Sequence, residues 1–197
     1  MTAMDQEDER ATVARLRAGD AEAFDDVYDL YRPRLFAFLL RMTRRRTLAE
    51  DLLDETWLRL VSHASTLESG TRLAPWLFTV ARNLYWSYRR AVGVEEAHAP
   101  ELLSLWPAPQ PWPSPFDLAA AAELERRVEI ALATLSPQYR EVVLLVAHEG
   151  LTPGEAAVVC GTTPEALRQR LSRARAGIAR ALDAMPAIIR LDRGFGT

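Results

Sequence analysis

The stretch LAPWLFTVARNLYWSYRRA, residues 73–91, decides what fold the rest of the chain must support. It holds three Arg and five aromatic residues, and no Asp or Glu. Its apolar residues recur at helical spacing, which predicts a helix with one face toward a core. The residues on that face are Leu77, Val80, Ala81, Leu84 and Tyr88. We therefore expect a helical domain built around this segment.

The opposite side of this helix carries two rows of residues, Phe78, Arg82, Tyr85 and Arg89 in the first, and Thr79, Asn83, Trp86 and Arg90 in the second. Arg neutralises phosphate, aromatic rings stack on unpaired bases, and Asn pairs with a base edge. The pattern fits a surface for single-stranded nucleic acid. It also fits an amphipathic core helix whose aromatic rings are simply buried.

Length and composition limit the class of protein. With 197 residues, one or two domains are expected. No apolar run has the length of a membrane span, and the acidic start MTAMDQEDER is unlike a secretory signal. We expect a cytoplasmic location. Cys160 is the only cysteine, which excludes a disulfide framework and a cysteine-based zinc site. We expect it to be a small core residue, and we expect no metal or cofactor.

Charge alternates in sign along the chain, although the net charge is only −3. Residues 32–46 hold six Arg and no acid, residues 72–91 hold four Arg and no acid, and residues 165–193 hold seven Arg and three acids. Such blocks predict local basic faces on an otherwise acidic protein, as in nucleic-acid-binding proteins.

The N-terminal part reads as consecutive helices. Residues 8–19 predict a short helix that ends at Gly19, and Asp20 is a suitable N-cap for a helix over residues 21–45. Pro33 should break or kink that helix near Tyr31.

A third helix is expected over residues 48–63. Thr47 and Glu50 have the spacing of a capping box. The apolar stripe of this helix is Leu53, Trp57, Leu60 and Val61.

Six prolines between Gly93 and Phe116 exclude continued helix or sheet. We interpret residues 93–117 as an extended acidic linker, in which Trp106 and Trp112 could dock on a partner. The expected organisation is an N-terminal helical domain (1–92), this linker, a C-terminal domain (118–185) and a tail (186–197). The fold class is all-α, with two small helical domains joined by the Pro-rich linker.

The C-terminal domain should begin with a helix over residues 119–134 that turns Leu124, Val128, Ala131 and Leu132 inward. Three further helices are then expected to begin with the same pattern, a Ser or Thr as N-cap followed by Pro as the first helical residue. The pairs are Ser136-Pro137, Thr152-Pro153 and Thr163-Pro164. Thr152 and Glu155 also form a capping-box pattern.

Only Cys160-Gly161-Thr162 separate the last two helices, which is the pattern of a helix-turn-helix. The second helix of the motif buries Leu167, Leu171, Ala174, Ile178 and Leu182. Its outward residues are Arg168, Gln169, Ser172, Arg173 and Arg175. Arg and Gln can pair bidentately with guanine and adenine in the major groove. A solvated Arg-rich helix face is the alternative.

Four motifs in order make the chain similar to a bacterial RNA polymerase sigma factor of the extracytoplasmic-function (ECF) group. FDDVYDLYRPRLFAFLLRM resembles the opening helix pair of the family, and AEDLLDETWLRLV its polymerase-docking helix. The stretch at 73–91 resembles the promoter-melting segment. LSPQYREVVLLVAHEGLTPGEAAVVCGTTPEALRQRLSRAR resembles the C-terminal helix-turn-helix.

The resemblance implies three binding surfaces and the partners that use them. Core polymerase would bind the helix around Asp51, Asp54, Glu55, Trp57 and Arg59. The minus-ten element would be melted and held by Arg82, Asn83, Trp86, Arg89 and Arg90, with the loop 62–72 and Asn83 forming a pocket for a flipped base. The minus-thirty-five element would be read by Arg168, Gln169, Ser172 and Arg173, with Arg175 beside them. An anti-sigma factor is a further implied partner.

Other functions fit the sequence less well. The acids Glu50, Asp51, Asp54 and Glu55 crowd one helix, but a di-metal carboxylate bundle also needs Glu-x-x-His pairs, which the chain lacks. We therefore expect no catalysis. An autonomous helix-turn-helix regulator remains possible, although the basic aromatic segment Arg82–Arg90 has no purpose in a sensor domain. A sigma-like decoy that titrates an anti-sigma factor remains a third possibility.

Overall fold

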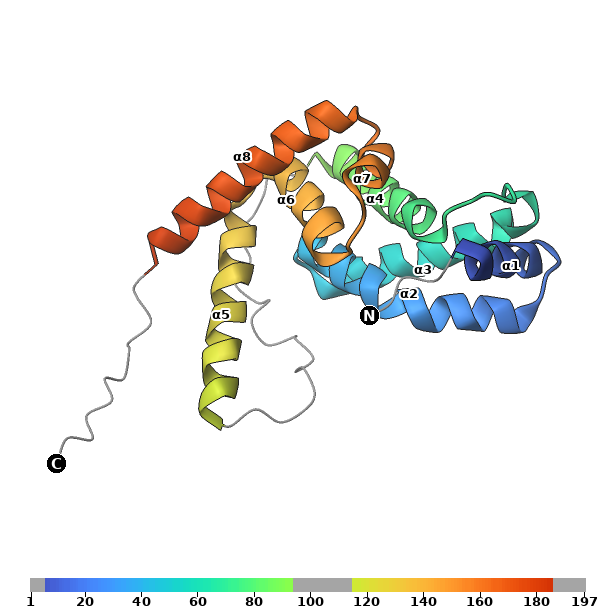
Figure 1. Cartoon of the computed structure of the whole chain (residues 1–197), viewed down its shortest axis with the longest axis horizontal. Coiled ribbons are helices and arrows are strands. Elements are labelled where there is room, and N and C mark those ends of the chain that lie inside the picture. The colour runs from blue at the N-terminus through green and yellow to red at the C-terminus, as the bar shows by residue number, and fades with distance from the viewer. Residues whose placement is uncertain (1–5, 94–114, 186–197) are drawn as a thin grey trace.

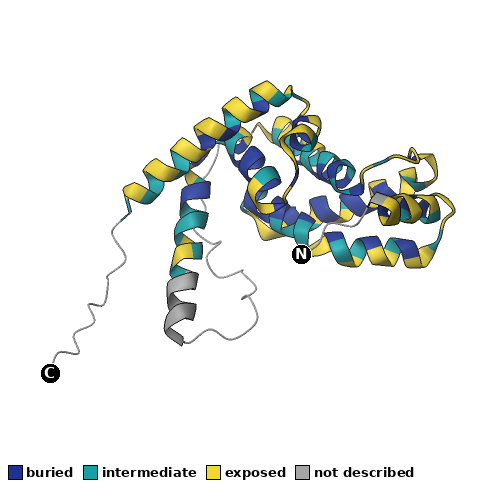
Figure 2. Cartoon of the chain, viewed as in Figure 1, coloured by how far each residue is buried: buried dark blue, intermediate teal, exposed yellow. Residues whose placement is uncertain are grey.

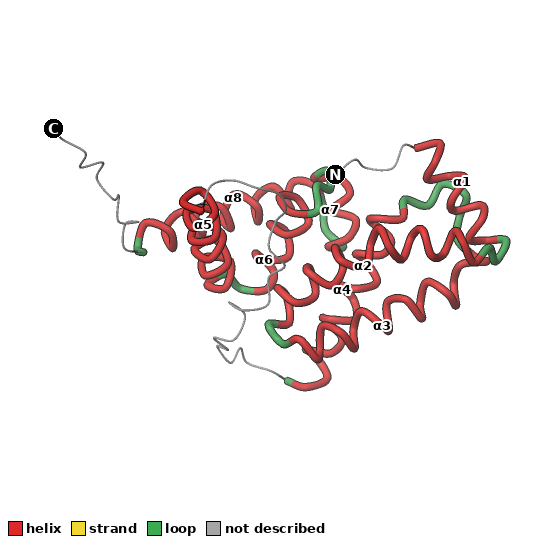
Figure 3. Tube along the Cα trace, turned by 90° about the horizontal axis from the view of Figure 1, so that it is seen from below, coloured by secondary structure: helices red, strands yellow, loops and turns green. Residues whose placement is uncertain are grey.

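The computed structural model describes the backbone of residues 6–93 and 115–185, and side chains over residues 7–93 and 123–185. Every element in these ranges is helical (Figures 1 and 3). The N-terminal unit holds α1 (Gln6–Arg17), α2 (Ala21–Thr43), α3 (Arg46–His63), the short 3₁₀ turn η1 (Ala64–Thr66) and α4 (Leu73–Val92). The C-terminal unit holds α5 (Pro115–Thr134), α6 (Pro137–Val143), the π-helical turn η3 (Leu144–His148), α7 (Pro153–Cys160) and α8 (Pro164–Asp183). The all-α fold class is confirmed.

No helix in the described parts of the chain is both long enough and apolar enough to cross a membrane. Most of the expected linker, with Trp106 and Trp112, and the tail 186–197 lie outside the described residues. Helix α5 begins at Pro115, earlier than the expected start at residue 119.

The start of α2 agrees with the prediction from the sequence, but the middle of the helix differs from it. The Asp20 carboxylate accepts hydrogen bonds from the amides of Glu22 (3.0 Å) and Ala23 (3.3 Å), as an N-cap should. Of the break or kink expected at Pro33, the break does not occur, because α2 continues through this residue to Thr43. Tyr31 and Leu35, on either side of Pro33, are buried in the core. Packing of the flanking turns therefore holds a helix that lacks one backbone donor.

The capping box expected at Thr47 and Glu50 is also wrong. Helix α3 begins earlier, at Arg46, with no side-chain cap at its N-terminus. The Glu50 carboxylate instead pairs with the Arg46 Nε at 2.8 Å, one helical turn away. The chain enters α3 through Arg44, whose positive φ of 57° ends α2.

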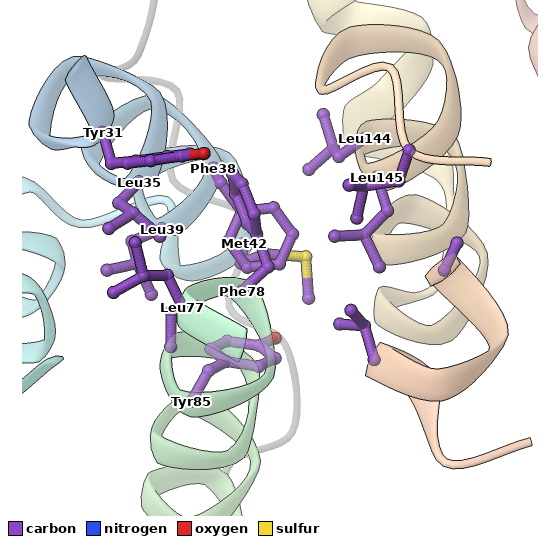
Figure 4. Packing of buried hydrophobic residues seen from close by; sticks show 14 of the residues in the cluster. Tyr31, Leu35, Phe38, Leu39, Met42, Leu77, Phe78, Tyr85, Leu144 and Leu145 are labelled. Carbon is purple, nitrogen blue, oxygen red and sulfur yellow. The ribbon is translucent and has the colours of Figure 1, made fainter. Parts of the chain in front are cut away.

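The two units pack directly on each other and share one apolar core. Helix α4 lies against α7, and α2 lies against α6. In Figure 4, Phe38, Met42 and Phe78 from α2 and α4 face Leu144 and Leu145 from the C-terminal unit. All five side chains are at most 2% exposed. Burial of this apolar surface supplies most of the attraction between the units.

Among the described residues, four ion pairs also join the units, and each has its Arg in the N-terminal unit and its Glu in the C-terminal unit. They are Arg34–Glu149 at 2.9 Å, Arg41–Glu129 at 2.8 Å, Arg72–Glu155 at 3.1 Å and Arg82–Glu141 at 3.1 Å. Because the Arg of every pair belongs to the N-terminal unit, the basic blocks of that unit lie partly against acidic residues of the same chain.

Candidate nucleic-acid interface

The helix-turn-helix forms as the sequence predicts. The Thr152 side chain and Glu155 form the expected capping box at the start of α7, with the Thr152 amide donating to Glu155 Oε2 at 2.9 Å. Gly161 ends α7 with a φ of 59°, a left-handed conformation that side chains other than glycine rarely adopt. Thr163 Oγ1 then accepts from the Ala166 amide at 3.2 Å and opens α8.

Helix α8 presents its polar residues to solvent. Leu167, Leu171 and Ala174 are buried against the other helices of the C-terminal unit. The exposed residues include the whole predicted set, Arg168, Gln169, Ser172, Arg173 and Arg175. Figure 2 shows this exposed face along the length of α8. The interior residues of the helix thus fix the direction in which its Arg and Gln side chains point.

Cys160 lies at the end of α7 and is 5% exposed. Burial raises the pKa of its thiol to about 12, and the nearby Glu141 carboxylate adds to this effect. The thiol behaves as a small apolar core group, as expected from the sequence.

The first turn of α4 is held by a residue that the sequence analysis missed. Glu9 of α1 is 5% exposed. Its carboxylate accepts from the Leu73 amide at 2.8 Å and from the Arg72 Nε at 2.7 Å. Arg72, the N-cap of α4, supplies no side-chain cap, so α1 provides one from a distance. Residues 9 and 73 are far apart in the sequence, and no sequence pattern indicated that they contact each other.

The outward rows expected on α4 are only partly exposed. Asn83 and Arg90 are exposed. Phe78 and Tyr85, which were predicted to face outward, are 0% and 3% exposed. This prediction was wrong because α4 is covered by α2 and α3 of its own unit and by α7 of the other, so its apolar face is wider than one interface would need. Phe78 packs edge-on against Phe38, with ring centroids 5.4 Å apart.

The expected inward stripe of α4 is correspondingly mixed. Leu77 and Ala81 are fully buried. Val80, Leu84 and Tyr88 are only half-buried. In the described C-terminal unit, Leu124 also departs from its expected inward position, with 56% exposure.

Arg82 and Trp86 of α4 both bind one carboxylate of the C-terminal unit. Arg82 donates from Nε to Glu141 Oε2 at 3.1 Å and from Nη2 to Oε1 at 3.4 Å. The Trp86 indole Nε1 donates to the same Oε2 at 2.7 Å. The Arg89 guanidinium lies 5.7 Å from the centroid of the Trp86 ring. The Arg89 guanidinium and the Trp86 ring are therefore adjacent, as predicted. The Trp86 indole, however, is already hydrogen-bonded to Glu141 of the same chain.

A cavity of about 330 Å³ opens between α3 and α4. It is lined by Arg59, His63, Trp76, Val80, Asn83, Leu84 and Ser87. Asn83 and His63 belong to the set expected to form a base pocket. Apart from His63, no residue of the expected loop 62–72 lines the cavity, and the other lining residues come from α3 and α4. The cavity combines apolar walls with an indole, an amide and the polar side chains of Arg59, His63 and Ser87, which suits a planar polar group.

The exposed side of α3 differs in part from the set expected to bind polymerase. Asp51, Asp54 and Arg59 are exposed and Glu55 is half-buried, with Arg59 paired to Glu55 at 2.7 Å. Trp57 is only 6% exposed and packs on Tyr28, with ring centroids 4.9 Å apart.

Two apolar residues complete this side of α3. Leu58 and Val61 are 63% and 60% exposed, so the inward position expected for Val61 is wrong. Residues 51, 54, 58 and 61 share one helical face, which joins two acids to two exposed apolar side chains.

An all-helical protein with a basic helix-turn-helix and a basic aromatic helix is of a nucleic-acid-binding class. Sequence models of known families then narrow the class. The Sigma-70 region 2 model matches residues 27–93, and the Sigma-70 region 4 model matches residues 125–177. These matches cover both units.

Characterised relatives agree with these matches. The chain is 36% identical to the RNA polymerase sigma factor CarQ of Myxococcus xanthus over 159 residues, which is 81% of this chain and 88% of CarQ. It is 31% identical to the ECF RNA polymerase sigma factor SigM of Bacillus subtilis over 77% of this chain and 90% of SigM. The chain belongs to the ECF group of RNA polymerase sigma factors and is an alternative sigma factor.

Solved structures share the fold. The sigma factor RpoE of Bartonella quintana, solved with the anti-sigma factor NepR, aligns with a TM-score of 0.66 and 25% identity over 84% of this chain and all of that one. CnrH, solved with the cytosolic domain of CnrY, aligns with a TM-score of 0.65 and 23% identity over 90% of this chain and 99% of that one. The second likeness supports the fold alone.

Proposed function

We propose that each sigma activity of this chain lies on one helix, with polymerase binding on α3, promoter melting on α4 and upstream promoter recognition on α8. The exposure of the whole predicted α8 set supports this division most strongly. The domain limits expected from the sequence, 1–92 and 118–185, are part of the proposal. An autonomous regulator is not favoured, because the region 2 match at residues 27–93 covers the half that a regulator would use as a sensor. A decoy is not favoured, because the chain keeps exposed Arg residues on α8, which a decoy does not need.

On α3, the face of Asp51, Asp54, Leu58 and Val61 binds core RNA polymerase. An apolar strip beside charged residues is typical of a protein-binding surface. Trp57 supports this face from beneath, since it is buried against Tyr28. Glu55 and Arg59, paired with each other, lie at its border.

On α4, Asn83 and the cavity between α3 and α4 receive a base that leaves the duplex at the minus-ten element. The base would sit between the indole of Trp76 and the side chain of Leu84, within hydrogen-bonding reach of the amide. Arg82, Trp86, Arg89 and Arg90 follow the released strand, because they place cations and a ring along one side of the helix.

On α8, Arg168, Gln169, Ser172 and Arg173 read base edges of the minus-thirty-five element, and Arg175 contacts the backbone. Arg and Gln near the start of a recognition helix have the geometry for bidentate contacts in the major groove. Each unit alone has few phosphate contacts, so its separate affinity is low. Binding of both units to one polymerase raises their effective concentration at the promoter.

The proposed partners are core RNA polymerase, promoter DNA and an anti-sigma factor. An anti-sigma factor is included because the related RpoE of Bartonella quintana was solved with one. The chain acts in the cytoplasm, where bacterial RNA polymerase works, and the chemistry of transcription belongs to the polymerase rather than to this chain.

Gel filtration with bacterial core RNA polymerase tests the α3 surface. The wild-type chain should co-elute with core. An Asp51→Arg/Asp54→Arg double variant should not, because it reverses two charges on the proposed face. The matched control, Asp25→Arg/Asp29→Arg, makes the same charge change at exposed positions of α2 and should co-elute. Full co-elution of the α3 variant would refute the assignment.

A further inference from the structure

Helix α1 lies outside the parts of the chain that the family models match. The region 2 match begins at residue 27, whereas α1 spans Gln6–Arg17. The helix is nevertheless packed into the N-terminal unit, because Val13 and Leu16 are buried in its core. The family match therefore gives no role to a helix that the fold firmly includes.

The contacts of α1 fall at both ends of the loop that joins α3 to α4. At the first end, α1 lies against η1 (Figure 1). At the second end, the Glu9 carboxylate accepts from Arg72 and from the Leu73 amide, at the distances given above. Between these ends, residues 68–70 are exposed, and the bond from the Thr71 amide to the Glu68 carbonyl at 2.9 Å is a local one. Helix α1 thus holds the loop at both of its ends.

The residues on either side of this loop line the cavity that is proposed to receive a base. His63 ends α3, before the loop, and Trp76 lies in the first turn of α4, after it. The Trp76 amide donates to the Arg72 carbonyl at 3.0 Å. The indole is therefore one helical turn from the residues that Glu9 binds, and its position in the cavity depends on that turn.

The first turn of α4 depends on Glu9 for its capping. Leu73 is 0% exposed, so water cannot reach its amide, and the helix has neither a side-chain cap of its own nor an acid in its first turn. The Glu9 carboxylate supplies both the missing acceptor and a negative charge at the positive end of the helix dipole. Without it, a buried donor is left unpaired, and the turn must move to reach another acceptor.

We propose that Glu9 is a positioning residue for promoter melting, which holds the loop 64–72 and the first turn of α4 in the arrangement that forms the base cavity. The proposal rests on the role of that cavity in the proposed function. Glu9 itself is buried and acts through Trp76. A flipped base binds only molecules in which this arrangement is intact, so its apparent affinity falls with the fraction of such molecules.

Two substitutions grade the contact. Glu9→Ala removes both accepting oxygens, whereas Glu9→Gln keeps one acceptor for the Leu73 amide and loses the charge that pairs with Arg72. The matched control is Glu7→Gln, which makes the same charge change at an exposed position of α1. Circular dichroism checks that each variant keeps the helical content of the wild type, and gel filtration checks that each still binds core RNA polymerase.

Hydrogen–deuterium exchange of the full-length protein, followed by mass spectrometry, measures the local opening. In Glu9→Ala, peptides over residues 64–76 should exchange at least about fivefold faster than in the wild type, because a charge-assisted cap is lost. Glu9→Gln should lie between the two, and Glu7→Gln should match the wild type. Unchanged exchange over residues 64–76 would overturn the positioning role. Faster exchange over the whole N-terminal unit would also overturn it, because Glu9 would then be a general stability residue.

Transcription by the reconstituted holoenzyme measures the effect on melting. The template is a fragment of bacterial genomic DNA on which the wild-type holoenzyme starts transcription, used as linear duplex and with a mismatched bubble over the opened segment. Glu9→Ala should reduce initiation on the duplex at least about fivefold and should reduce it less on the bubble, where the base is already unpaired. An equal loss on both templates would overturn the role in melting.

A variant of the cavity itself separates this inference from the proposed function. Asn83 lines the cavity directly, so Asn83→Ala should reduce initiation on the duplex whatever the role of Glu9. If it does, but Glu9→Ala initiates as well as the wild type, the cavity assignment stands and the positioning role is wrong. If Asn83→Ala has no effect on either template, the base cavity of the proposed function is itself wrong.

Discussion

The indole nitrogen of Trp86 donates a 2.7 Å hydrogen bond to the carboxylate of Glu141, 55 residues further along the chain. The bond joins the helix expected to hold melted promoter DNA to the helix that precedes the helix-turn-helix. Its acceptor has no exposed surface. The two helical units of the sigma factor are therefore joined at a carboxylate that is fully buried between them.

Replacing Trp86 by Phe should weaken this contact between the units while keeping the aromatic ring that we propose to stack on bases. The variant loses one hydrogen bond to a buried carboxylate, which lowers the free energy of unfolding by about 1.5–3 kcal/mol. Urea denaturation followed by circular dichroism measures the change. The control is Trp76→Phe, since Trp76 lines the cavity between α3 and α4 and makes no contact with Glu141. Equal effects of both changes would count against a special role for the Glu141 bond.

Phe78 should behave as a core residue. It is fully buried and packs edge-on against Phe38, so Phe78→Ala should lower the free energy of unfolding by about 3–5 kcal/mol. Phe78→Leu, which fills most of the volume, should cost less. If Phe78→Ala unfolded at nearly the same denaturant concentration as the wild type, the ring would have to lie on the surface, as the sequence first indicated.

Cys160 should be chemically silent in the folded protein. Its thiol pKa is raised to about 12 by burial, so at about pH 8 almost all of it is protonated, whereas an exposed thiol has a pKa near 8.5 and is partly thiolate. Ellman's reagent should label no cysteine in native buffer and one cysteine per chain in guanidinium chloride. Rapid labelling of the native protein would show that α7 is not packed as described.

The capping box at Thr152 should contribute measurably to the helix-turn-helix. Thr152→Ala removes the side chain that accepts from the Glu155 amide and should cost about 1 kcal/mol. Thr152→Ser keeps the hydroxyl and should stay close to the wild type, as judged by thermal unfolding. A Ser variant as unstable as the Ala variant would indicate that the methyl group, rather than the cap, matters.

Much of the fold was predictable from interactions between residues that are close in the sequence. Asp20, Thr152, Gly161 and Thr163 act as caps or turn residues because such effects depend on only a few neighbouring residues. The exposed face of α8 was predictable for a similar reason, since one side of the helix packs and the other meets solvent. The exposure of the residues that we propose to read the upstream element therefore followed from periodicity.

Contacts between distant residues were not predictable. Pro33 stays inside α2 because its neighbours are buried, and Phe78 is buried because a second unit covers α4. Glu9 caps α4 from α1, and Glu141 binds Arg82 across the units. None of these pairs has a characteristic spacing. The basic blocks of the sequence indicated DNA contact, but Arg34, Arg41, Arg72 and Arg82 from these blocks pair with Glu residues of the other unit.

The most direct test of a sigma activity is transcription by core RNA polymerase on a library of bacterial genomic fragments, with sequencing of the 5′ ends of the transcripts. A sigma factor should create start sites that core alone lacks, each preceded by a shared pair of upstream motifs. Arg168→Ala/Arg173→Ala should lose most of these starts while still binding core. If the wild-type chain co-elutes with core but produces no new start sites on any fragment, the chain is not an initiation factor.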